Sequence, residues 1–152
     1  QGIALQCDPL PDPALEDVLA RHREGDSILV VLDQITDPHN VGAILRSAAG
    51  FGAHAVIMPD RNAPPASGTL AKSASGALEL LPLIRVTNLA RCLEQLADHD
   101  YWRIGLDASA PQTLAESRPG KRTALVMGAE VSIMLNGSQS NNDMLRNDLF
   151  SG

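Results

Sequence analysis

Short apolar runs alternate along most of the chain with longer segments in which apolar residues have helical spacing. The apolar runs predict buried strands, at about residues 27–34, 54–59, 81–86, 101–106 and 122–127. Apolar residues that recur every three or four positions predict helices, at about residues 12–23, 41–51, 69–79 and 89–97. Strands that alternate with helices of this length favour an open parallel sheet with helices on both faces, so the predicted fold class is α/β.

The helix expected at residues 89–97 has the clearest pattern. Asn88 is a good N-cap, and one stripe of this helix carries four apolar residues, Leu89, Cys92, Leu93 and Leu96. The helix expected at residues 69–79 is weakened by Gly76, because glycine costs about 1 kcal/mol in a helix interior. The last 22 residues differ from the rest: the stretch from Asn136 to Asp143 is polar and almost without apolar periodicity, so we expect no apolar strand there.

Composition narrows the classes of function. With 152 residues and 44% hydrophobic content, the chain can bury one core. No apolar run has the length of a transmembrane helix, and the N-terminus lacks the pattern of a secretory signal. The cysteines, Cys7 and Cys92, and the four histidines show no metal-ligand spacing. We therefore expect a cytoplasmic protein with no membrane partner and no metal.

The net charge of −6 opposes RNA binding by the surface as a whole, because phosphate contacts require basic groups. An RNA site would need a local basic surface or a separate basic domain. Five residues are candidates for a local surface: Arg46, Arg61, Lys72, Arg85 and Arg91.

Residues 36–46, with the sequence TDPHNVGAILR, follow the first predicted strand and open the next helix. Asp37 and Pro38 predict a turn, and Asn40 is the expected N-cap. Arg46 then lies about two turns into the helix. Ligands of open α/β sheets bind beyond the carboxyl ends of the strands, and an arginine there can bind a phosphate or carboxylate through two parallel hydrogen bonds.

This segment resembles the first motif of the SpoU/TrmH family of SPOUT-class RNA 2′-O-ribose methyltransferases, which the run NVGAILR from Asn40 to Arg46 matches in full. The run TALVMGAE at residues 123–130 is similar to the start of the family's second motif. The run PLIRVTNLA at residues 82–90 is similar to the bacterial branch that methylates a guanosine of large-subunit ribosomal RNA. The third motif of the family is not recognisable after Glu130.

The resemblance implies transfer of a methyl group from S-adenosylmethionine to a ribose 2′-hydroxyl of ribosomal RNA by a homodimer. It assigns activation of the hydroxyl to Arg46, which is a poor proton acceptor but can stabilise negative charge on oxygen. The residues that it implies for catalysis are Arg46, Asn40 and Glu130. The residues that it implies for cofactor binding are Leu106, Asp107, Ala108, Met127 and Gly128.

The resemblance also sets expectations for the organisation of the chain. It implies a SPOUT-type catalytic domain at residues 14–130, with a knot-forming C-terminal segment that is missing or altered in an atypical tail, residues 131–152. Residues 1–13 carry Pro9, Pro11 and Pro13, and we expect a partly extended linker from an absent N-terminal RNA-binding domain. Because only two of three cofactor loops are recognisable, we expect this chain to bind S-adenosylmethionine weakly or not at all.

Each of these residues also has an ordinary structural explanation. Arg46 could form a surface ion pair, Asn40 could simply cap its helix, Glu130 could be an exposed loop carboxylate, and the strand-end residues could serve in turns. The missing third motif keeps another function open, that of a non-catalytic RNA- or protein-binding α/β module of the same ancestry. An unrelated flavodoxin-like domain for a small ligand is a further alternative.

Overall fold

The computed structural model describes residues 2, 3, 6, 8, 10, 12–65, 67–106, 113–117, 119–128 and 142–145. The helices are α1 (Leu15–Arg21), α2 (Pro38–Gly50), the 3₁₀ turn η1 (Asp60–Asn62), α3 (Gly68–Ala74), α4 (Ala77–Leu80), α5 (Leu89–Asp98) and α6 (Leu114–Ser117). The strands are β1 (Ser27–Asp33), β2 (Ala55–Pro59), β3 (Leu83–Val86), β4 (Trp102–Leu106), β5 (Arg122–Gly128) and β6 (Asn142–Leu145).

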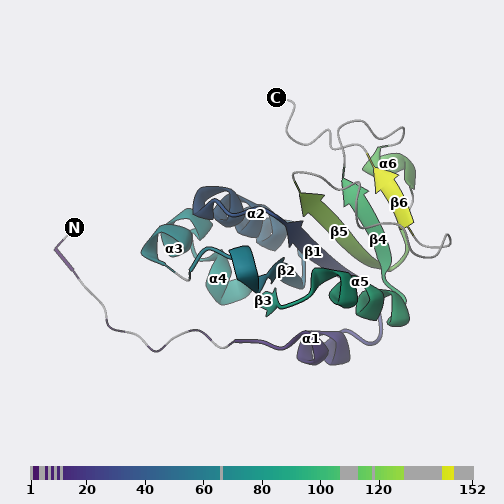
Figure 1. The fold of residues 1–152 in the computed structure, drawn as a ribbon, viewed down its shortest axis with the longest axis horizontal. Helices are drawn as coiled ribbons and strands as arrows, with labels where there is room; N and C mark the ends of the chain where they lie inside the picture. Colours follow the sequence, from purple (N-terminus) through teal and green to yellow (C-terminus); the bar gives the residue numbers. More distant parts are fainter. Residues whose placement is uncertain are drawn as a thin grey trace.

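The described strands form one parallel sheet in the order β3-β2-β1-β5-β4-β6 (Figure 1). Strand β1 is central and pairs along its whole length with β5, from Ser27 opposite Arg122 to Asp33 opposite Gly128. The carboxyl ends of β1, β5 and β4 therefore reach the same edge of the sheet, where α2 begins. This sheet confirms the predicted α/β class.

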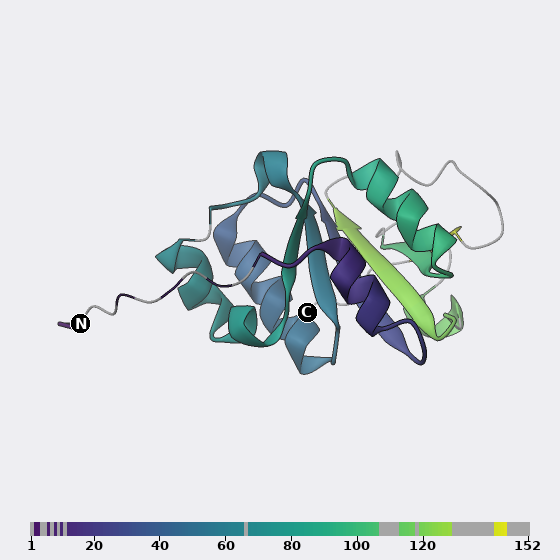
Figure 2. The same ribbon diagram turned by 90° about the horizontal axis from the view of Figure 1, so that it is seen from below.

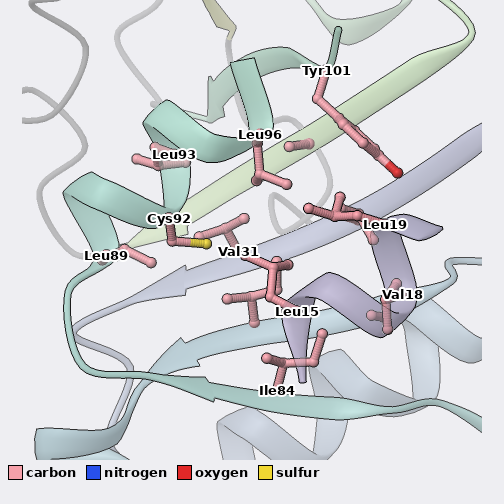
Figure 3. Packing of buried hydrophobic residues seen from close by; sticks show 14 of the residues in the cluster. Leu15, Val18, Leu19, Val31, Ile84, Leu89, Cys92, Leu93, Leu96 and Tyr101 are labelled. Atoms are coloured by element: carbon pink, nitrogen blue, oxygen red, sulfur yellow. The ribbon is translucent and has the colours of Figure 1, made fainter. Parts of the chain in front are cut away.

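Helices cover both faces of the sheet, as predicted (Figures 1 and 2). Successive side chains of a strand point to opposite faces, so Leu29 and Val31 pack in a cluster with α1 and α5, while Val30 and Leu32 pack with α2, α3 and α4. Figure 3 shows the first cluster, in which apolar side chains of α1 and α5 lie against the sheet. The stripe predicted for α5 is buried: Leu89, Cys92, Leu93 and Leu96.

The boundaries of two helices differ from the prediction. Helix α1 begins at Leu15, three residues later than expected, because no side chain caps it earlier and Pro13 lies just before it. The single helix expected at residues 69–79 is two helices, α3 and α4, which are separated by Ser75 (φ 50°) and Gly76 (φ 85°). Left-handed backbone at these two residues turns the chain, and both short helices contact α2.

The amino end of the sheet holds a polar cluster that the sequence did not predict. The Tyr101 hydroxyl lies 2.7 Å from Ser27 Oγ, and the Arg122 guanidinium stacks 4.5 Å from the centre of the Tyr101 ring. His22, which ends α1, packs edge-on against His54, with ring centres 4.2 Å apart. The His54 Nδ1 atom accepts a hydrogen bond from the Ile28 backbone N–H, so these contacts join the end of α1 to β1 through the residue that precedes β2.

Three elements were not expected from the sequence, η1, α6 and β6. The stretch from Asn136 to Asp143 was expected to hold no apolar strand, and its last two residues lie in β6, which pairs in parallel with β4. The physical reason is that an edge strand is held by backbone hydrogen bonds, so a four-residue strand carries too little alternation to be recognised.

Candidate active site

The segment between β1 and α2 places the first motif at the carboxyl edge of the sheet. Helix α2 begins at Pro38, and its N-cap is Asp37, whose carboxylate accepts a hydrogen bond from the His39 N–H at 3.2 Å. The prediction that Asn40 caps the helix is wrong, because proline is favoured in the first turn and moves the start of the helix forward. Asn40 instead lies in the first turn and is exposed.

Arg46 is held by a neighbouring helix and not by an acid. Its Nη1 atom donates a hydrogen bond to the backbone carbonyl of Ser73 in α3, at 3.1 Å. Within the described ranges no carboxylate lies within ion-pair distance of Arg46, so the alternative of a surface ion pair finds no partner. The guanidinium is exposed and fixed in place, and its positive charge is left available to a ligand.

Gly42 lets α3 come close enough for this contact. A Cβ atom on Gly42 would lie 2.5 Å from Ser73 Cβ and 2.8 Å from the Ser73 carbonyl carbon. The Ser73 hydroxyl also donates a hydrogen bond to the His39 carbonyl, at 3.1 Å. Two hydrogen bonds and one glycine thus join the first-motif helix to α3, beside Arg46.

A hollow of about 530 Å³ opens between α2 and α3. Its lining residues are His39, Arg46, Gly68, Thr69, Lys72 and Ser73. The lining contains two permanent cations and an imidazole, but no carboxylate, although the chain as a whole carries a net charge of −6. A local positive region of this kind attracts anions, because nearby low-dielectric walls concentrate its field.

The structure places the five candidate basic residues in different parts of the molecule, with Arg61 in η1. Arg46 and Lys72 line the same hollow. Arg85 is occupied elsewhere, since it donates to the Pro64 carbonyl at 3.0 Å and lies 3.8 Å from the Asp60 carboxylate. Arg91 lies on α5, which covers the other face of the sheet.

Three of the residues implied for cofactor binding meet at the ends of β4 and β5. Leu106 pairs in register with Met127, and Leu106 is buried while Met127 is half-buried. A Cβ atom on Gly128 would lie 2.8 Å from the Asp33 carbonyl oxygen, so only glycine fits between the ends of β1 and β5. Burial raises the pKa of the Asp33 carboxyl beside this contact. Leu106 and Met127 pack in one apolar cluster of the core at this edge of the sheet.

The other predicted site residues lie outside the described residues. These are Asp107 and Ala108, which follow β4, and Glu130, which follows β5. The segment expected to form the knot also lies outside them, apart from β6. The expectation that this chain binds S-adenosylmethionine weakly or not at all stays a prediction.

Sequence reasoning missed the contribution of α3. Thr69 and Ser73 line the hollow, and the Ser73 carbonyl fixes Arg46. One signal was present, because a glycine inside a helical motif indicates close approach of another backbone. Gly42 therefore indicated that another segment packs closely against α2, but nothing in the sequence identified α3 as that segment.

Other classes of site find little support in the described part of the chain. No helix there is long and apolar enough to cross a membrane. No group of three or more His, Cys, Asp or Glu residues among these ranges could hold a metal ion. A second, smaller hollow of about 180 Å³ lies between α1 and α5, away from the motif, and its lining mixes acidic and basic side chains.

Several known proteins are similar to this chain. The 23S rRNA (guanosine-2′-O-)-methyltransferase RlmB of Salmonella typhi is 44% identical over 133 residues, which are 86% of this chain and 54% of that protein. The protein of the same name from Escherichia coli strain K12 is 50% identical over 102 residues, 67% of this chain and 42% of that protein. The chain thus spans about half the length of the curated relatives it matches.

Solved structures share the fold of this chain, and a family profile matches its sequence. The SpoU methyltransferase AviRb from Streptomyces viridochromogenes, in complex with the cofactor AdoMet, superimposes with a TM-score of 0.75 at 21% identity and covers 94% of this chain and 56% of that one. An rRNA methyltransferase from Sinorhizobium meliloti gives a TM-score of 0.66 at 19% identity, over 85% and 50%. The SpoU rRNA Methylase family profile matches residues 27–136, well over half of the chain. The chain therefore belongs to the SpoU rRNA Methylase family.

Proposed function

We propose that this chain is the catalytic part of an enzyme that transfers a methyl group from S-adenosylmethionine to the ribose 2′-hydroxyl of a guanosine in 23S ribosomal RNA. The observation that carries the proposal is the state of Arg46, a fixed and exposed guanidinium that no described carboxylate neutralises. It lines a hollow whose charge is opposite to that of the chain as a whole. The names of the relatives, which are guanosine 2′-O-methyltransferases of 23S rRNA, supply the substrate.

The hydroxyl oxygen is a weak nucleophile, because its proton is held tightly. Negative charge develops on the oxygen as its proton leaves to solvent. The oxygen would then bond to the methyl carbon as the bond from that carbon to the sulfonium of S-adenosylmethionine breaks, and the cofactor would leave as a neutral thioether. A guanidinium donates hydrogen bonds and accepts none, so the role of Arg46 is to stabilise this charge and not to remove the proton. Its hydrogen bond to the Ser73 carbonyl fixes the side chain before the RNA binds. Such preorganised donors contribute most when they need no rearrangement during the reaction.

Cofactor binding is proposed for the ends of β4 and β5. Leu106 and Met127 would contact the adenine, and Gly128 would let it approach the backbone. Asp107 and Ala108 are proposed for the same pocket, and Glu130 for the catalytic centre, on the basis of the motif resemblance. S-Adenosylmethionine would supply the methyl group. Asn40, exposed in the first turn of α2, is proposed to contact the ribose.

The test is methyl transfer to a 23S rRNA transcript by the full-length enzyme and by its Arg46→Ala variant. Removing one preorganised donor should lower kcat by about 10²- to 10³-fold. Calorimetric titration should show unchanged affinity for S-adenosylmethionine, because Arg46 lies on α2 and α3 residues hold it, away from the ends of β4 and β5. Arg91→Ala is the matched control, since it removes an exposed arginine from the other face. Equal kcat in the Arg46→Ala and Arg91→Ala variants would remove Arg46 from the reaction.

We also propose a homodimer in the cytoplasm. The small residues Ala48 and Ala49 at the end of α2 offer little to an interface, because Ala48 is buried in the chain's own core and Ala49 packs against that core. The exposed Phe51 that follows α2 is a better candidate for an interface, since 80% of its surface is accessible. Analytical ultracentrifugation of wild type and Phe51→Ser would decide: a shift of the variant toward monomer supports this face.

A further inference from the structure

We propose that Lys72 binds a backbone phosphate of the RNA next to the nucleotide whose ribose faces Arg46. The inference rests on the proposed function, and it assigns to Lys72 a role that is separate from that of Arg46. Lys72 would act as a positioning residue that fixes the strand, while Arg46 acts on the reacting oxygen.

The position of Lys72 follows from the contacts that fix α3. Its neighbour Ser73 accepts the hydrogen bond from Arg46 and donates one to the His39 carbonyl. Because adjacent residues of one short helix move together, the same contacts that fix Arg46 also fix the Cα of Lys72. The Lys72 side chain is exposed, lies in the last turn of α3, and lines the same hollow as Arg46.

The chemistry of the hollow selects an anion with more than one charge. Its lining supplies the guanidinium of Arg46, the ammonium of Lys72, the hydroxyl of Thr69 and the ring of His39, with no acid among the lining residues. The volume, about 530 Å³, is within the range of small-ligand sites. A single small anion would leave one cation unused, whereas a nucleic-acid strand presents a ribose and a phosphate at successive positions. Lysine is a compact point charge suited to a phosphate, while the planar fork of arginine suits a developing oxyanion.

The expected size of the effect comes from counterion release. Each phosphate neutralised on a single strand contributes about 0.7 to the slope of log affinity against log salt. Loss of one such contact should therefore weaken binding about fivefold at ~0.1 M salt and have almost no effect at ~1 M salt. If only the net charge of the protein mattered, loss of a cation from either face of the molecule would weaken RNA binding equally.

The experiment measures binding of a fluorescein-labelled RNA stem-loop with a guanosine in the loop, by anisotropy, across a series of salt concentrations. The proteins are the 152-residue chain and its variants Lys72→Ala, Lys72→Arg and Arg91→Ala. Lys72→Ala should lose about fivefold in affinity at ~0.1 M salt and about 0.7 in slope. Lys72→Arg should retain both, and Arg91→Ala, which removes the same charge from the opposite face, should behave as wild type.

Two outcomes separate this inference from the proposed function. If wild type binds the RNA and Lys72→Ala loses no more affinity than Arg91→Ala, the assignment of Lys72 is wrong and the proposed function stands. If wild type does not bind the RNA at any salt concentration, the RNA substrate itself fails, and the inference fails with it. In methyl-transfer assays, Lys72→Ala should raise KM for RNA and leave kcat nearly unchanged, whereas Arg46→Ala lowers kcat. A fall in kcat alone for Lys72→Ala would contradict a role in binding the strand.

Discussion

Replacing Gly42 by alanine should separate helix propensity from packing in α2. The added Cβ would lie 2.5 Å from Ser73 Cβ and 2.8 Å from the Ser73 carbonyl carbon, whereas ordinary contacts are 3.4–4 Å. Two of the atoms that it meets belong to the Ser73 backbone or are attached directly to it, so a change of rotamer cannot relieve the overlap. Helix α3 must therefore retreat from α2.

The expected cost is the difference between two terms. Overpacking of this kind costs about 1–3 kcal/mol, and the better helix propensity of alanine returns about 1 kcal/mol. Because the overlap involves backbone, we expect a net loss of about 1–2 kcal/mol. Gly50→Ala is the matched control, since it lies in the same helix and its Cβ would meet nothing within 4 Å. This control should be neutral or slightly more stable than wild type.

Urea unfolding of the three proteins gives the free energies of unfolding, provided that the m-values agree. A Gly42→Ala/Ser73→Gly double variant completes the test, because removal of the Ser73 side chain relieves the contacts at Oγ and Cβ and leaves only the one at the carbonyl carbon. The cost of Gly42→Ala should be smaller in that background. If Gly42→Ala proves as stable as Gly50→Ala, the close approach of α2 and α3 is wrong, and with it the hydrogen bond that fixes Arg46.

Two further predictions use titratable groups. Burial, with a smaller contribution from Glu16, raises the pKa of the Cys92 thiol to about 11. In a Cys7→Ser background, this thiol should therefore react with a disulfide reagent at about pH 8 only as fast as the chain unfolds. Rapid reaction of the folded protein would contradict the burial of Cys92. Burial lowers the pKa of His22 below its ordinary value of 6.5, and His54, Arg21 and Arg122 lower it further. The unfolded chain then binds the proton more tightly, so His22 should cost no stability above about pH 6.5 and an increasing amount as the pH falls below it. Urea unfolding midpoints of wild type and His22→Gln, measured at neutral and acid pH, should fall less steeply with pH in the variant. An identical fall in the two proteins would refute the linkage.

Local signals predicted the sheet and its covering helices well, for identifiable reasons. The run from Ile28 to Leu32 predicted a buried strand, and in β1 all of these residues except Ile28 are buried. Asn88 caps α5 as expected, accepting from the Arg91 N–H at 3.0 Å. The match from Asn40 to Arg46 pointed to the helix that lines the basic hollow, α2. These features depend on residues that are close together in the sequence.

What could not be predicted depends on contacts between distant segments. The partner of Arg46 is a backbone carbonyl, and a carbonyl has no sequence signature. The start of α2 was misplaced because Asp37 and Asn40 are comparable caps, and the choice between them was made by Pro38. Strand β6 was missed because its four residues pair with β4 through backbone atoms, and such pairing leaves no recognisable pattern in so short a segment.

The order of the strands has a consequence for the time course of folding. Strand β1 gains its first neighbour, β2, soon after synthesis, but its other neighbour, β5, is made only after β2, β3, β4 and their helices. At ribosomal rates this delay is on the order of 10 seconds. During that interval the edge of the most apolar strand in the chain is unpaired, and unpaired apolar edges promote aggregation. A nascent chain stalled before Arg122 should therefore depend on chaperones that bind extended apolar segments, and completion of β5 should end that dependence.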